Sequence, residues 1–88
     1  MLNKRNPDAA AIYDCPICQQ GRQMVRCEIS TGKLYLRCEE CDSVWDEPET
    51  ANTSELVAPD DKYGASRFVM VDELRDHPWF SFISNKGI

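Results

Sequence analysis

The stretch CPICQQGRQMVRCEISTGKLYLRCEEC, residues 15–41, decides the fold of this 88-residue chain. Four of its five cysteines form two C-x-x-C pairs separated by 19 residues, and the fifth, Cys27, lies between the pairs. Two thiolates three residues apart in a tight turn can point at one ion, and a second such turn completes a tetrahedral four-sulfur site. The spacing therefore predicts one structural Zn²⁺ per chain, bound by Cys15, Cys18, Cys38 and Cys41.

The expected compartment supports a metal over a disulfide framework. The N-terminal residues lack the apolar run of a signal peptide, and no segment has the roughly 18 apolar residues of a membrane span. We therefore expect a cytosolic protein without a membrane segment, and disulfides are rare in the reducing cytosol. A closed four-thiolate site leaves no open position for water or substrate, so we expect a structural zinc and no enzyme.

The residues between the cysteine pairs alternate as in a β-hairpin. Thr31-Gly32 is a candidate two-residue turn, because glycine adopts positive φ freely. On the outer face of the hairpin, Arg26 and Arg37 are expected to face each other. On the inner face the turn sets a register with three apolar pairs: Ile29 with Leu34, Cys27 with Leu36, and Val25 with Cys38. In this register Cys27 acts as a small apolar side chain.

CPIC and CEEC resemble the two knuckles of the zinc ribbon, and the resemblance covers residues 15–45. It implies the zinc ligands and a hairpin core, to which we add a third strand at Asp42–Trp45. Zinc knuckles often place glycine after the second cysteine, where this chain has Gln19 and Asp42. We expect Gly21 to absorb the strain at Gln19. The predicted fold class is a small, mostly β or α+β domain whose C-terminal extension contains a short helix.

Composition divides the chain into four segments. We expect an N-terminal arm, a zinc ribbon, an acidic linker and an apolar C-terminal extension, at residues 1–14, 15–45, 46–63 and 64–88. The extension ends in an aromatic cluster that is expected to pack on the exposed side of the small sheet, with an exposed docking patch as the alternative. The cluster consists of Trp79, Phe80, Phe82 and Ile83.

Residues 46–88 account for the whole net charge of the chain. They contain nine acidic and four basic residues, and the chain has a net charge of −5. A general nucleic-acid binder needs surplus positive charge, whereas an acidic surface favours a basic protein partner. We therefore expect a non-enzymatic protein-binding module rather than a nucleic-acid binder, with contact residues Asp46, Glu47, Glu49, Asp60, Asp61, Trp79 and Phe80.

Narrower and alternative functions stay open from the sequence. The stretch TGKLYLRCEECDSVWDEPE, residues 31–49, and the Trp-Phe-rich end resemble small bacterial zinc-ribbon proteins of the toxin-immunity type. That resemblance implies an inhibitor of a cognate toxin, often a basic nuclease. Arg26, Tyr35 and Arg37 are also consistent with a nucleic-acid-binding ribbon of transcription or translation machinery. The paired knuckles permit rubredoxin-like electron transfer with iron as well.

Overall fold

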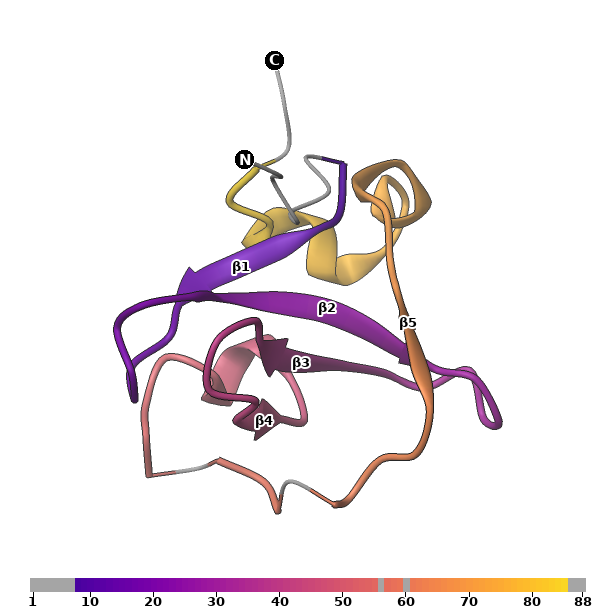
Figure 1. Cartoon of the computed structure of the whole chain (residues 1–88). Helices are drawn as coiled ribbons and strands as arrows, with labels where there is room; N and C mark the ends of the chain where they lie inside the picture. Colours follow the sequence, from indigo (N-terminus) through magenta and orange to yellow (C-terminus); the bar gives the residue numbers. More distant parts are fainter. Residues whose placement is uncertain (1–7, 56, 60, 86–88) are drawn as a thin grey trace, which may run out of the picture.

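The computed structural model describes residues 8–55, 57–59 and 61–85. Within these ranges the chain forms three short 3₁₀-helices and no α-helix: η1 (Pro48–Thr50), η2 (Val71–Leu74) and η3 (Pro78–Phe82). Its centre is an antiparallel sheet of five strands (Figure 1): β1 (Ala11–Asp14), β2 (Arg22–Glu28), β3 (Leu34–Cys38), β4 (Val44–Trp45) and β5 (Ser66–Phe68). The small, mostly β fold is confirmed, and the expected helix of the extension is replaced by η2 and η3. No helix of the described ranges is long and apolar enough to cross a bilayer.

β2 is the strand around which the sheet is built. The strand order is β1-β2-β3-β4, and β5 also pairs with β2. β3 pairs with one edge of β2. The other edge is shared by two strands: β1 pairs with the N-terminal end of β2, and β5 pairs with its C-terminal end. Where they meet, Ala10 N–H donates to the Val69 carbonyl at 2.8 Å, and Val25 N–H donates to the Ala10 carbonyl at 2.9 Å. Segments far apart in the chain are thereby joined on one strand.

Residues 11–14, which the sequence placed in an N-terminal arm, form β1. Residues 9–12 are buried, because small alanine side chains allow the sheet and the C-terminal segment to approach closely. The side-chain amide of Asn85 covers the outer edge of β1. It accepts a hydrogen bond from Ala11 N–H at 3.0 Å and donates one to the Ala9 carbonyl at 2.7 Å, so it satisfies backbone groups that a further strand would otherwise pair.

The hairpin register differs from the predicted one by two residues. The structure pairs Cys27 with Leu34, Val25 with Leu36 and Gln23 with Cys38. The cause is the turn: Glu28 N–H donates to the Lys33 carbonyl at 2.9 Å, and Gly32 N–H donates to the Glu28 carbonyl at 2.7 Å. Residues 29–32 therefore form a longer loop, in which Ile29 is 66% exposed and Gly32 has a φ of +76°. A shift of two leaves the side chains that lie within β2 and β3 on their predicted faces, whereas Ile29 leaves the inner face for the loop.

One core joins the hairpin to the C-terminal extension. It contains inner-face side chains of β2 and β3 together with Trp45, Val69, Leu74 and Ile83. Trp79, Phe80 and Phe82 are half-buried and pack against this core. The aromatic cluster is therefore part of the hydrophobic packing, on the same face of the sheet as Val25 and Cys27.

Candidate metal centre

Two turns of the same form carry the four cysteines of the C-x-x-C pairs. In the first, Gln19 N–H donates to the Cys15 carbonyl at 3.1 Å, and in the second Asp42 N–H donates to the Cys38 carbonyl at 3.2 Å. The first turn lies between β1 and β2, and the second lies between β3 and β4. Because β2 and β3 pair along their length, the two turns lie beside each other at one end of the hairpin.

The four sulfur atoms form one compact cluster. Their Sγ atoms all lie within 4.8 Å of one another, and no other group of metal-ligating side chains is found in the described ranges. Cys15 Sγ lies 3.6 Å from Cys41 Sγ, and Cys18 Sγ lies 3.6 Å from Cys38 Sγ. A tetrahedron with Zn–S bonds of about 2.3 Å places its sulfurs about 3.8 Å apart, whereas a disulfide needs about 2.0 Å. The spacing therefore fits a metal ion coordinated by four thiolates.

Backbone N–H groups surround the sulfur atoms. Cys15 Sγ accepts from the N–H groups of Ile17 and Cys18 at 3.4 and 3.5 Å. Cys38 Sγ accepts in the same way from Glu40 and Cys41, both at 3.4 Å. These donors stabilise negative charge on sulfur. The backbone of the turns thus favours the thiolate form that a metal requires.

The residue after the second cysteine of each turn adopts the left-handed conformation. Gln19 has a φ of +56° and Asp42 a φ of +65°. The expectation that Gly21 would absorb the strain was wrong, because Gln19 itself has the positive φ. Gly21 is buried for another reason: a Cβ there would lie 2.5 Å from Glu40 Cγ and 2.9 Å from Glu39 Cγ. Glycine is needed where the two turns approach each other.

The thiols experience different environments. Burial raises the pKa of Cys38 to about 12. Burial acts in the same direction at Cys41, but hydrogen bonds with Ser43 and the neighbouring thiols lower the pKa of Cys41 to about 7. A coordinating metal removes the proton from a thiol. The donor set thus fits a thiophilic ion such as Zn²⁺ bound by Cys15, Cys18, Cys38 and Cys41, as the sequence predicted.

Gln23 is a residue beside the site that the sequence analysis did not single out. It pairs with Cys38 across the hairpin and is fully buried. Its Nε2 donates to the Ala51 carbonyl at 2.5 Å, which ties the metal-binding end of β2 to the C-terminal end of η1. The signal in the sequence is weak, since only the alternation of β2 places this glutamine on the core face.

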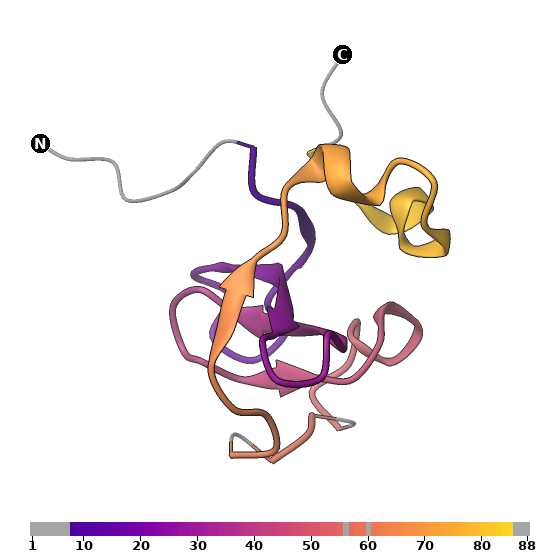
Figure 2. The ribbon, with the colours of Figure 1, turned by 90° about the vertical axis from the view of Figure 1, so that its right-hand side faces the viewer.

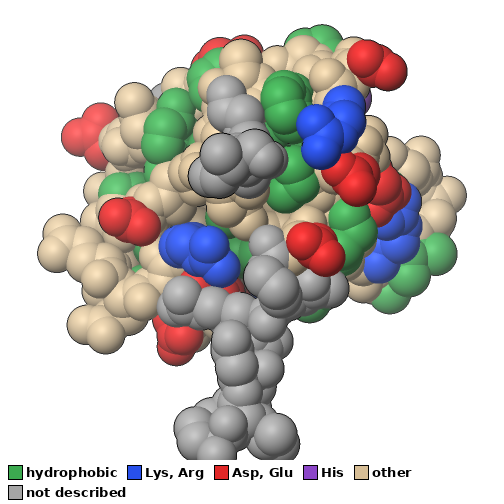
Figure 3. Space-filling view, turned by 90° about the horizontal axis from the view of Figure 1, so that it is seen from above, with side chains coloured by type: hydrophobic (Ala, Val, Ile, Leu, Met, Phe, Trp, Pro, Cys, Tyr) green, Lys and Arg blue, Asp and Glu red, His purple; other side chains and the backbone are tan. Residues whose placement is uncertain are grey.

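The predicted partner-binding residues lie in two separate regions. Glu47, Glu49 and Asp61 are exposed, and Asp60 lies outside the described residues. The loop that contains Asp61 lies at the end of the molecule opposite η2 and η3 (Figures 1 and 2). Trp79 and Phe80 belong to η3. Seen from the η2–η3 end, hydrophobic side chains alternate with charged ones instead of forming one continuous patch (Figure 3).

Asp46 differs from the other acidic residues of this set because it has partners within the fold. Its Oδ1 accepts hydrogen bonds from Lys62 Nζ at 2.7 Å and from the Tyr63 hydroxyl at 2.5 Å. These two bonds lower the pKa of Asp46. Asp46 thus holds the returning loop against the end of β4.

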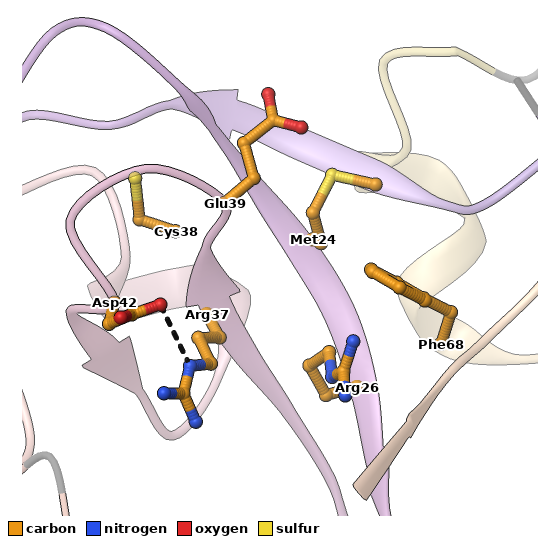
Figure 4. A pocket seen from close by; sticks show the side chains of 7 residues that line it. All are labelled: Met24, Arg26, Arg37, Cys38, Glu39, Asp42 and Phe68. Atoms are coloured by element: carbon orange, nitrogen blue, oxygen red, sulfur yellow. Dashed lines mark hydrogen bonds and ion pairs between the residues drawn. The ribbon is translucent and has the colours of Figure 1, made fainter. Parts of the chain in front are cut away.

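Arg26 and Arg37 flank a hollow on the outer face of the sheet (Figure 4). It has a volume of about 180 Å³, and Met24 and Phe68 also line it. The two arginines do not face each other directly, because Arg26 pairs with Tyr35 in the observed register. The Arg26 guanidinium lies 4.1 Å from the centre of the Phe68 ring, and Arg37 Nε donates to Asp42 Oδ1 at 3.3 Å.

No family model matches the chain, and no match was found to a curated protein or to a solved structure. The resemblance to toxin-immunity proteins therefore gains no support from these comparisons. The assignment of the metal centre rests on the geometry of the four cysteines, which indicates a structural metal-binding module.

Proposed function

We propose that this protein is a non-enzymatic module that binds a basic protein, with one Zn²⁺ that holds its fold together. The four-sulfur cluster supports the zinc part of the proposal, because the two turns that lie beside each other at one end of the hairpin converge on it. Four thiolates fill the coordination shell of zinc, so the ion would not activate water. Its contribution would be to the stability of a small sheet.

The contact surface of the proposal is acidic. Glu47, Glu49 and Asp61 are exposed, whereas the charge of Asp46 is compensated by Lys62. Four thiolates around Zn²⁺ would add about two negative charges at the metal-binding end of the hairpin. Complementary charge raises the rate of association with a basic surface, and the effect weakens with salt.

Nucleic-acid binding is the weaker candidate, because the outer-face arginines have acceptors within the fold. Arg26 donates from Nε to Ser66 Oγ at 3.0 Å and from a terminal nitrogen to the Ser66 carbonyl at 3.1 Å. Arg37 pairs with Asp42 at 3.3 Å. Phosphate groups would have to compete with these contacts and with the negative charge of the chain.

A charge-reversal experiment tests the binding proposal. The zinc-loaded chain is immobilised and used to capture proteins from a lysate at low and at high salt. The captured proteins are then compared with those captured by the triple variant Glu47→Lys, Glu49→Lys, Asp61→Lys. We expect one basic protein that the variant loses and that high salt releases. An inhibitor of a basic toxin would be the narrower form of this result. The proposal would be contradicted if the variant still captured the basic protein. It would also be contradicted if the wild type bound an oligonucleotide tightly and in a salt-sensitive way.

Native mass spectrometry tests the metal separately. We expect one zinc per chain in protein purified without added metal. Iron in its place would favour the electron-transfer alternative, and two disulfides without metal would exclude the zinc module.

A further inference from the structure

The four thiols of the metal centre differ in how far they are covered. Cys15 and Cys38 are buried, Cys18 is half-buried and Cys41 is exposed. The sulfurs of Cys15 and Cys38 are each contacted by two backbone N–H groups. Cys41 Sγ lies 3.2 Å from the Ser43 hydroxyl, on the exposed side of the cluster. A small reagent that arrives from solvent therefore meets Cys41 first.

The sulfur nearest to Cys41 belongs to the other turn. Cys41 Sγ lies 3.6 Å from Cys15 Sγ, and the second short contact, also 3.6 Å, joins Cys18 to Cys38. Both short contacts thus link the two turns to each other. A thiol adjacent to an oxidised cysteine is the one that resolves it into a disulfide, and here that thiol is Cys15.

We propose that Cys41 is a site of oxidation by peroxides and that the product is a disulfide between Cys41 and Cys15 that displaces the metal. The inference rests on the proposed metal site. The Cys41 sulfur attacks one oxygen of hydrogen peroxide; the O–O bond breaks, an S–O bond forms and hydroxide leaves. The Cys15 sulfur then attacks the Cys41 sulfur; the S–S bond forms, the S–O bond breaks and a second hydroxide leaves. The two sulfurs lose two electrons, which the peroxide gains.

The disulfide removes two of the four ligands. The metal then keeps only Cys18 and Cys38, which do not complete a tetrahedral site. Cys27 provides an internal comparison within the same chain, because it is 8% exposed and packs in the hydrophobic core. We expect it to stay reduced while the metal centre reacts.

The sequence allows a direct test by peptide mapping. Tryptic cleavage after Arg5, Arg22, Arg37 and Lys62 places Cys15 and Cys18 on the peptide 6–22, and Cys38 and Cys41 on the peptide 38–62. The full, zinc-loaded chain is treated with about one equivalent of hydrogen peroxide, the remaining thiols are alkylated and the protein is digested. We expect the two peptides to be cross-linked, with alkylated Cys18 and Cys38, and about one zinc released per cross-link. Disulfides within either peptide, or a first sulfenic acid trapped by dimedone at another cysteine, would overturn the proposal.

Two variants serve as matched controls. In the zinc-loaded chain Cys41 is already a thiolate, so Ser43→Ala, which removes the hydroxyl 3.2 Å from its sulfur, should raise the nucleophilicity of that sulfur and increase the rate of oxidation about threefold, whereas Cys27→Ala should leave that rate unchanged. An unchanged or lower rate in Ser43→Ala would contradict the role of Cys41 as the first point of attack. Zinc content before peroxide is added separates the two proposals. A chain without metal contradicts the zinc module, and a zinc-loaded chain that forms no cross-link contradicts only the oxidation.

Discussion

Gln19 shows at the scale of one residue how the metal site constrains the backbone. The residue after the second cysteine of each turn has positive φ, at +56° for Gln19 and +65° for Asp42. Asparagine and aspartate tolerate this region better than other residues with a Cβ. Asp42 is also bonded to Arg37, whereas Gln19 is exposed. The conformational free-energy cost of positive φ is therefore greater at Gln19 than at Asp42.

Gln19→Gly should stabilise the zinc-loaded protein by about 1 kcal/mol, because glycine adopts positive φ without a steric penalty. Thermal unfolding measures the change. Gly21→Ala is the matched control and should destabilise the protein, since its Cβ would lie 2.5 Å from Glu40 Cγ. A lower melting temperature for Gln19→Gly would contradict this account of the turn.

The affinity for zinc should fall as the pH falls. The pKa of Cys38, raised to about 12, means that this thiol keeps its proton in the metal-free site at pH 6–8 and must lose it on binding. Each such proton weakens the apparent affinity about tenfold per pH unit on acidification. Cys41, with a pKa of about 7, adds a second proton only below that pH. Competition with a chromogenic chelator measures the apparent zinc affinity at each pH. We expect this affinity to fall at least tenfold per pH unit on acidification, and more steeply below pH 7. An affinity that does not change with pH would contradict the prediction.

At the scale of elements, the acidic segment after β4 returns to cover the outer face of the sheet. Tyr63 stacks on the fully buried Tyr35, with ring centres 4.0 Å apart and planes 5° apart. The Tyr63 hydroxyl donates to Asp46 at 2.5 Å. Burial, followed by this bond, raises the pKa of Tyr63. Part of the expected linker therefore serves as packing for β3.

Tyr63→Ala and Tyr63→Phe should separate the two roles of this side chain. The alanine variant loses both the stack and the hydrogen bond, which should cost about 2 kcal/mol of unfolding free energy. The phenylalanine variant loses only the bond to the partly exposed Asp46 and should cost about 1 kcal/mol or less. Urea denaturation of both zinc-loaded variants measures the difference. Equal losses would show that the stack on Tyr35 contributes nothing.

At the scale of the whole molecule, the metal centre and the C-terminal extension belong to one hydrophobic core. The same cluster contains Cys15, Cys38, Trp45, Leu74 and Ile83. A hairpin of this size is marginal without support, and a metal bound by the four cysteines would join its two strands at the end away from the loop. Loss of the metal should therefore disturb the extension as well as the sheet.

Removal of zinc by a chelator should unfold the chain cooperatively. Trp45 is fully buried, and its Nε1 donates to the Thr53 carbonyl at 3.0 Å, so its fluorescence should shift to the red. Cys38→Ser should produce the same shift without a chelator. Cys27→Ala should keep its zinc, because Cys27 is not part of the sulfur cluster. A chelated chain that retains the native spectrum would show that the fold does not depend on the metal.

The sequence by itself determined which four cysteines cluster, the hairpin, and the face of each inner side chain that lies within β2 and β3. Those conclusions need only local geometry: a C-x-x-C turn points two sulfurs the same way, and strand alternation has a period of two. Only the tertiary structure decided the register, the role of residues 9–14 and the packing of the aromatic segment. The register depends on a loop bonded through Glu28 and Lys33. The other features depend largely on contacts between residues far apart in the chain, such as Ala10 with Val69 and Ala11 with Asn85, which the local pattern of a chain does not encode.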